Sequence, residues 1–192
     1  MRSLPRVAAL AAAVGMLAVA GCSDLSRTDN DFDPGVNKGR IVTIDPDERD
    51  DPVDASGETV GGEDLDLADY RGRVVVLNIW WSGCGPCRRE MPLLVDVVGD
   101  LGDDAALLGV NIREASADNA RSFLRGIDVD FPSFYDPGSE LLLEFDGKVS
   151  PYAVPSTAVL DREGRLAALV TGEVDAPSTF SGIVADVVAE AQ

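Results

Sequence analysis

The residues best suited to chemistry are two cysteines three positions apart, in the segment WWSGCGPCRREMP at positions 80–92. Besides Cys84 and Cys87 the sequence contains one cysteine, Cys22, and it contains no histidine. A Cys-x-x-Cys pair can alternate between a dithiol and a disulfide, because one thiolate attacks a partner's disulfide and the other resolves the mixed disulfide that forms. The spacing therefore points to thiol–disulfide exchange.

Other uses of the pair stay open at this point. A purely structural bridge is possible, although so short a loop removes little entropy from the unfolded chain. A zinc site would need two more ligands, and the sequence has no histidine to supply them. Transfer of Cu(I) through two thiolates is a further alternative. We expect no metal site and no cofactor other than the redox-active disulfide between Cys84 and Cys87.

The elements around the cysteines would place them between a strand and a helix. Residues 73–81, RVVVLNIWW, form an almost unbroken β-branched and aromatic run, which is typical of a strand covered on both faces. From Pro86 the apolar residues recur at helical spacing, and proline is tolerated in a first helical turn. Free N–H groups and the dipole at that helix end would favour a Cys84 thiolate and lower its pKa. Cys87, one turn deeper, suits the resolving role.

The rest of the globular part predicts alternating strands and helices. Two β-α-β units, a hairpin and a last helix imply an α/β domain with a mixed sheet and helices on both faces. The expected elements are strands at 105–112, 131–134, 156–160 and 166–170, helices at 116–126 and 176–189, and a brief helix within 136–147.

The first 57 residues predict export and a spacer. Two arginines and an apolar stretch too short to span a bilayer indicate a signal peptide at 1–21, and Val19-Ala20-Gly21-Cys22 resembles the bacterial lipobox. That resemblance implies a lipid anchor on Cys22; an ordinary secretory peptide is the alternative. Residues 22–57 are rich in Asp, Pro and Gly and predict a disordered acidic linker, in which 41–44 could add an edge strand. The globular domain is placed at 58–192.

The charge balance limits the partners. Without residues 1–21 the chain keeps all 34 acidic residues and loses two of its 16 basic ones, which gives a net charge of −20. Nucleic acid is therefore not expected as a partner. Repulsion from anionic lipid headgroups suits a domain held off the membrane on a tether.

The motifs also resemble a known family. Residues 81–87, WSGCGPC, resemble the W-x-x-C-G-P-C active site of the thioredoxin superfamily, and 67–80 with 87–92 resemble the exported TlpA/ResA-type thiol–disulfide oxidoreductases. The likeness covers roughly 58–190. It implies a thioredoxin-like three-layer α/β/α sandwich with a central mixed β-sheet and a short N-terminal β extension.

The resemblance also implies roles for individual residues. Val154-Pro155 matches a cis-proline loop that faces the cysteines, although a trans proline at a strand edge is the alternative. Glu90 matches an active-site glutamate that tunes the thiol pKa values, with a surface helix glutamate as the alternative. Asn78 stands where cytosolic thioredoxins have a buried aspartate. The implied catalytic residues are Cys84, Cys87 and Glu90, and the implied substrate-binding residues are Trp81, Gly85, Pro86, Val154 and Pro155.

The function implied by the resemblance is that of a membrane-tethered, extracytoplasmic, monomeric oxidoreductase. It would reduce exported client disulfides, such as the haem-site cysteines of apocytochrome c, with electrons from a membrane thiol-transfer donor. Oxidation of exported proteins uses the same residues and stays open. Peroxiredoxins resemble P-x-x-x-T-x-x-C, but Leu77 and Trp81 occupy the Pro and Thr positions here. Copper chaperones of this fold resemble C-x-x-x-C with a distal histidine, which the sequence lacks.

Overall fold

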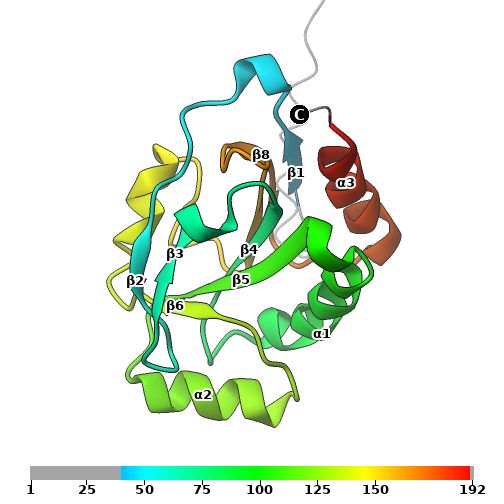
Figure 1. Ribbon diagram of the computed structural model, residues 1–192. Helices are drawn as coiled ribbons and strands as arrows, with labels where there is room; N and C mark the ends of the chain where they lie inside the picture. The colour runs from blue at the N-terminus through cyan, green and yellow to red at the C-terminus, as the bar shows by residue number, and fades with distance from the viewer. Residues whose placement is uncertain (1–39, 191–192) are drawn as a thin grey trace, which may run out of the picture. The chain divides into compact units, whose positions relative to one another are not determined.

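The buried run before the cysteines forms a central strand of a six-stranded sheet (Figure 1). A computed structural model describes residues 40–190 of the chain, and its strand order is β1-β8-β7-β4-β5-β6. Every residue of β4, Val74–Trp80, is buried. It pairs in parallel with β5, Ala105–Asn111, and antiparallel with β7, Ser156–Leu160. The outer strands are β6 (Ser133–Tyr135), β8 (Leu166–Thr171) and β1 (Arg40–Thr43).

Alternate side chains of β4 point to two different cores. Val74 and Val76 pack under the helices α1, Gly85–Gly99, and α3, Pro177–Ala189. On the other face, Val75, Leu77 and Ile79 pack beneath the 3-10 helix η4, Leu141–Phe145, and the segment that precedes β4. Burial on both faces explains why the sequence of β4 has no polar alternation.

A third cluster lies around the cysteines at the carboxyl end of β4. It joins Trp80, both cysteines and Met91 to the apolar side of α2, Ala117–Gly126. The ring of Trp80 stacks on that of Phe123, with 5.4 Å between their centroids. The strand and the two helices that meet here therefore fix the position of the disulfide.

The expected helices and strands from residue 73 onward are confirmed, with ends that differ by a few residues. The brief helix expected within 136–147 is the 3-10 helix η4. Short elements with little apolar sequence were not expected. They are the hairpin β2 (Ser56–Glu58) and β3 (Asp64–Asp66) and the 3-10 helices η1 (Pro46–Glu48), η2 (Leu67–Tyr70) and η3 (Gly102–Asp104).

Structured chain begins earlier than the boundary expected at residue 58. The edge strand considered at 41–44 is present as β1, which pairs antiparallel with β8. Val53 is 4% exposed, and the guanidinium of Arg49 pairs with the carboxylates of Asp161 and Glu190. Only a few buried side chains hold this acidic stretch against the domain, so its overall composition does not reveal that it is structured. Residues 40–57 therefore belong to the domain rather than to a disordered spacer.

The expected signal peptide at 1–21, the lipidated Cys22 and the linker up to residue 39 lie outside the described residues. Between residues 40 and 190, no helix is long and apolar enough to cross a membrane.

Candidate active site

The two cysteines are joined by a disulfide at the start of α1. Cys84 caps the helix, and its Sγ accepts a hydrogen bond of 3.1 Å from the backbone N–H of Cys87. Pro86 lies in the first turn, where the missing N–H of proline costs nothing, and Gly85 is exposed beside it. Cys84 is 5% exposed and Cys87 is fully buried. Of the two cysteines, only Cys84 therefore keeps any exposed surface.

The two tryptophans before the disulfide differ in their surroundings. Trp80 is fully buried, and its indole N–H donates a 2.7 Å hydrogen bond to Ser133 Oγ. Trp81 is half-buried and packs against the cluster that contains both cysteines. A Cβ on Gly83 would collide with the indole of Trp81, so the ring lies directly on the Gly83 backbone. Trp81 thus forms one wall beside the disulfide.

The loop before β7 forms a second wall of the site. The Val154–Pro155 peptide bond is cis, which excludes the alternative of a trans strand-edge proline. Ser156 pairs with Ile79 in the β4–β7 register, so the loop lies beside the end of β4 from which the cysteines follow. Val154 packs against the same cluster as the disulfide. Among the described residues its backbone N–H and C=O have no hydrogen-bond partner.

Glu90, three residues after Cys87 on α1, is buried rather than exposed on the helix. Its side chain is 1% exposed, which rules out an ordinary surface glutamate. One carboxyl oxygen accepts a hydrogen bond of 2.8 Å from Asn78 Nδ2, and the other accepts one of 2.8 Å from the N–H of Val174. Desolvation raises the pKa of Glu90 to about 7, although these two hydrogen bonds act in the opposite direction. Asn78 and Glu90 therefore form a buried pair in which only Glu90 can exchange a proton near neutral pH.

A turn that the sequence did not single out completes the site. Glu114, which follows β5, is 8% exposed and accepts hydrogen bonds of 2.9 Å from both the backbone N–H and the hydroxyl of Ser82. Asn111 Nδ2 also donates to it, at 3.4 Å. The signal that could have found Glu114 is topological, because adjacent parallel strands such as β4 and β5 end at the same edge of a sheet.

Two arginines, Arg88 and Arg89, follow Cys87 and are exposed on α1. The guanidinium of Arg88 lies 4.7 Å from the ring centroid of Phe123. Arg89 makes a two-point contact with the carboxylate of Glu173. Both side chains thus have partners other than the sulfur atoms.

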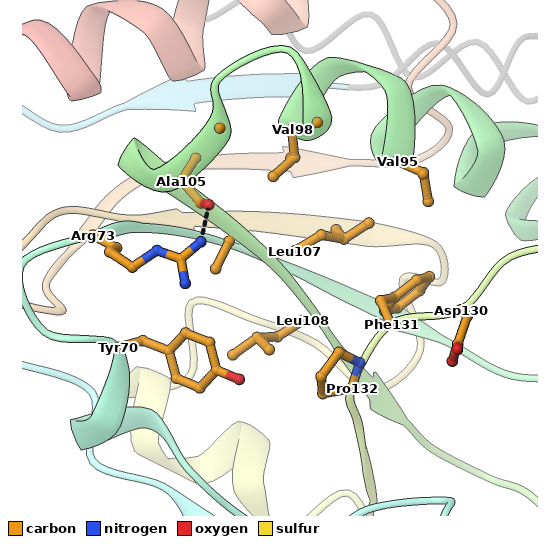
Figure 2. A pocket seen from close by; sticks show the side chains of 13 residues that line it. Tyr70, Arg73, Val95, Val98, Ala105, Leu107, Leu108, Asp130, Phe131 and Pro132 are labelled. Carbon is orange, nitrogen blue, oxygen red and sulfur yellow. Dashed lines mark hydrogen bonds between the residues drawn. The ribbon is translucent and has the colours of Figure 1, made fainter.

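The cavity in Figure 2 lies at the other end of the sheet. It has a volume of about 370 Å³ and is lined by Tyr70, Arg73 and the first half of β5, where Arg73 donates to the carbonyl of Ala105. Ala105 pairs with Val74, six residues before Trp80, so this cavity is remote from the disulfide. Among residues 40–190, no group of three or more His, Cys, Asp or Glu side chains could hold a metal ion.

Comparisons with known proteins agree with this fold and site. A sequence model of the AhpC/TSA family matches residues 50–169. Thioredoxin-like protein YneN of Bacillus subtilis (strain 168) is 34% identical over 113 residues, which are 58% of this chain and 64% of YneN. Thiol-disulfide oxidoreductase ResA of the same strain is 29% identical over 116 residues, which are 60% of this chain and 62% of ResA. These matches cover less than two thirds of either relative.

A solved structure is similar over more of its length. The secreted thiol-disulfide isomerase from Corynebacterium glutamicum superposes with a TM-score of 0.72 and 30% identity, over 78% of this chain and 92% of that chain. The fold and the disulfide therefore define a thioredoxin-like α/β protein. The chain belongs to the AhpC/TSA family, and the similarity to ResA-type thiol–disulfide oxidoreductases expected from its motifs is confirmed.

Proposed function

We propose that the protein is a thiol–disulfide oxidoreductase in which Cys84 is the nucleophile and Cys87 the resolving thiol. The observation that carries this proposal is the disulfide at the start of α1, where Cys84 keeps some exposed surface and Cys87 has none. The N–H of Cys87 points at Cys84 Sγ, and the same contact would stabilise a thiolate after reduction.

The exchange proceeds in two steps that transfer two electrons in total. The Cys84 thiolate attacks one sulfur of a client disulfide, which forms a mixed disulfide and releases the other client sulfur as a thiolate. The Cys87 thiolate then attacks Cys84 Sγ, which closes the Cys84–Cys87 disulfide and releases the second client thiolate. A thiol donor must reduce the protein again. With a client dithiol as reductant, the same steps run in reverse and oxidise the client.

The loop of Val154 and Pro155 would bind the client. The unpaired backbone groups of Val154 can pair with an extended segment next to the reacting cysteine. Trp81, Gly85 and Pro86 would contact that segment from the other side. Glu90 would act as a positioning residue. It lies one helical turn after Cys87, and its carboxyl group gains or loses a proton near neutral pH. This change of charge would alter how readily the Cys87 thiol is deprotonated.

Replacement of Cys87 by alanine tests the assignment of the two sulfurs. Without the resolving thiol, Cys87→Ala should accumulate mixed disulfides through Cys84, visible as bands that a reductant removes on non-reducing gels. The matched variant Cys84→Ala should trap nothing, because its remaining thiol is buried. Wild-type protein should reduce insulin disulfides with a thiol donor present. Absence of both trapping and insulin reduction would overturn the proposed function.

We place the protein outside the cytoplasm, held to the membrane by a lipid on Cys22, where apocytochrome c is a candidate client and a membrane thiol-transfer protein the electron donor. The lipobox-like sequence at 19–22 and the similarity to ResA support this proposal. A mass measurement on the mature protein tests the anchor, since an unmodified Cys22 would remove it.

The similarity to a secreted thiol-disulfide isomerase favours a second candidate, in which the protein oxidises or isomerises exported clients. The two directions differ in the reduction potential of the Cys84–Cys87 pair. A potential of about −180 mV or above, the range of protein disulfide isomerase, would count against the reductase and support the second candidate.

A further inference from the structure

Arg113 connects the two walls that flank the disulfide. It follows β5 by two residues, and its Nη1 donates a hydrogen bond of 3.3 Å to the carbonyl of Pro151, in the loop that leads to the cis proline. Its guanidinium also lies 5.6 Å from the ring centroid of Trp81. One exposed side chain therefore contacts both surfaces between which a client segment would lie.

The backbone of Arg113 adopts a conformation that is unfavourable for a large residue. Its φ is 56°, in the left-handed region. The other non-glycine residues with positive φ between 40 and 190 are Asp128, Ser139 and Asp146, which all have short side chains. Aspartate tolerates this region better than most residues do. Strained residues of this kind concentrate at functional sites. Arg113 is the one residue of these four that has a long side chain, and its strained backbone lies close to the disulfide.

Trp81 is held from two sides, by the Gly83 backbone and by the Arg113 guanidinium. A guanidinium over an indole face is an attractive cation–π contact. Tyr152 follows Pro151 in the chain and is 87% exposed, so a large aromatic side chain also lies at the surface of this loop. The charge of Arg113 is thus held against the Trp81 ring and the carbonyl of Pro151 at the edge of the site.

The charge of Arg113 is not neutralised by any carboxylate of residues 40–190. The adjacent Glu114 turns inward and accepts both of its short hydrogen bonds from Ser82. Arg89, by contrast, is paired with Glu173. The whole chain carries a net charge of −18, so an acidic client is repelled at long range. A fixed cation beside the disulfide would give such a client a local attraction at the place where its cysteine must bind.

We propose that Arg113 is a specificity-determining residue that selects client segments with an aspartate or glutamate next to the reacting cysteine. The carboxylate would bind the guanidinium atoms that Pro151 leaves free, while the client backbone pairs with Val154. This inference rests on the proposed oxidoreductase function and adds the chemistry of the preferred client. Charge complementarity of this kind determines which partner binds more than how tightly partners bind in general.

Two short peptides test the proposal, each closed by one disulfide and differing only in Asp or Asn beside the first cysteine. Stopped-flow measurement gives the second-order rate constant for reduction of each peptide by the reduced full-chain protein at low salt. We expect the Asp peptide to react about threefold to fivefold faster, the effect of one exposed charge pair at roughly 4 Å in water. Raising the salt concentration should shrink this ratio.

Variants assign the preference to one residue. Arg113→Asn keeps a residue that tolerates positive φ, and its Asp-to-Asn rate ratio should fall to about one. Arg113→Lys should keep part of the preference. Arg125→Gln removes the same charge from an exposed position on α2 and should leave the ratio unchanged. Equal rates for the two peptides with wild-type protein, or a preference that survives in Arg113→Asn, would overturn the inference. Failure to reduce either peptide would instead overturn the proposed function.

Discussion

At the scale of single residues, the position of Glu90 shows how burial changes the chemistry of a carboxyl group. The carboxyl group accepts hydrogen bonds from Asn78 and from the N–H of Val174, but it has no cation in direct contact. Two hydrogen bonds offset only part of the cost of removing a charge from water. The carboxyl group therefore titrates near neutral pH, with a pKa of about 7.

The raised pKa makes folding stability depend on pH. Between about pH 4.5 and 7 the folded protein keeps the Glu90 proton while the unfolded chain has lost it, so the free energy of unfolding falls as pH rises through this range. The loss is on the order of 3 kcal/mol and is complete above about pH 7. Glu90→Gln should lack this loss in urea unfolding at pH 5 and pH 8.

The control for this prediction is Glu48→Gln, which changes an exposed glutamate of η1 and should keep the wild-type pH dependence. The same Glu90→Gln protein tests the proposed role in catalysis. The pH profile of disulfide exchange should lose an inflection near pH 7. An unchanged profile would leave Glu90 with a structural role only.

At the scale of elements, the sequence predicted the strands and helices that have a clear apolar pattern. The run at 73–81 identified β4, because burial on both faces requires continuous apolar residues, and the helical spacing after Pro86 identified α1. The position of the cysteine pair followed from these two elements. Arg113 and Glu114 could not be placed this way, because they reach the site through the pairing of β4 with β5, about thirty residues away along the chain.

The contact between β5 and β6 depends on a glycine that no periodicity marks. A Cβ on Gly109 would lie 2.8 Å from Trp80 Nε1 and 2.9 Å from Phe131 Cε2, and it would collide with Ser133 Oγ. Gly109→Ala should therefore destabilise the protein by about 1–3 kcal/mol, through overpacking and loss of the Trp80–Ser133 hydrogen bond. Urea unfolding monitored by tryptophan fluorescence measures the change.

The matched control is Gly182→Ala in the exposed face of α3, where an added Cβ meets no atom within 4 Å. This substitution should stabilise the protein by about 0.5–1 kcal/mol, because alanine loses less backbone entropy than glycine in a helix. Equal effects of the two substitutions would contradict the close packing assigned to Gly109.

At the scale of the whole molecule, the first and last described segments are joined by one ionic cluster. The Arg49 guanidinium, whose side chain is 2% exposed, contacts Asp161 in the turn between β7 and β8 and makes a two-point contact with Glu190 after α3. Asp161 also accepts from the backbone and the guanidinium of Arg165. Arg49 thereby connects the segment after β1 to the end of the domain.

This connection predicts that residues 40–57 contribute to stability although their composition resembles that of a linker. Val53→Ala should lower the free energy of unfolding by about 1–3 kcal/mol, since it removes buried methyl groups. Arg49→Gln should cost about 1–3 kcal/mol, less than the loss of an isolated buried pair because Arg165 still faces Asp161. Asp47→Asn, exposed in η1, should change it by less than about 0.5 kcal/mol. Urea midpoints at unchanged m-value measure all three changes. If all three are equally small, residues 40–57 do not contribute to the stability of the domain.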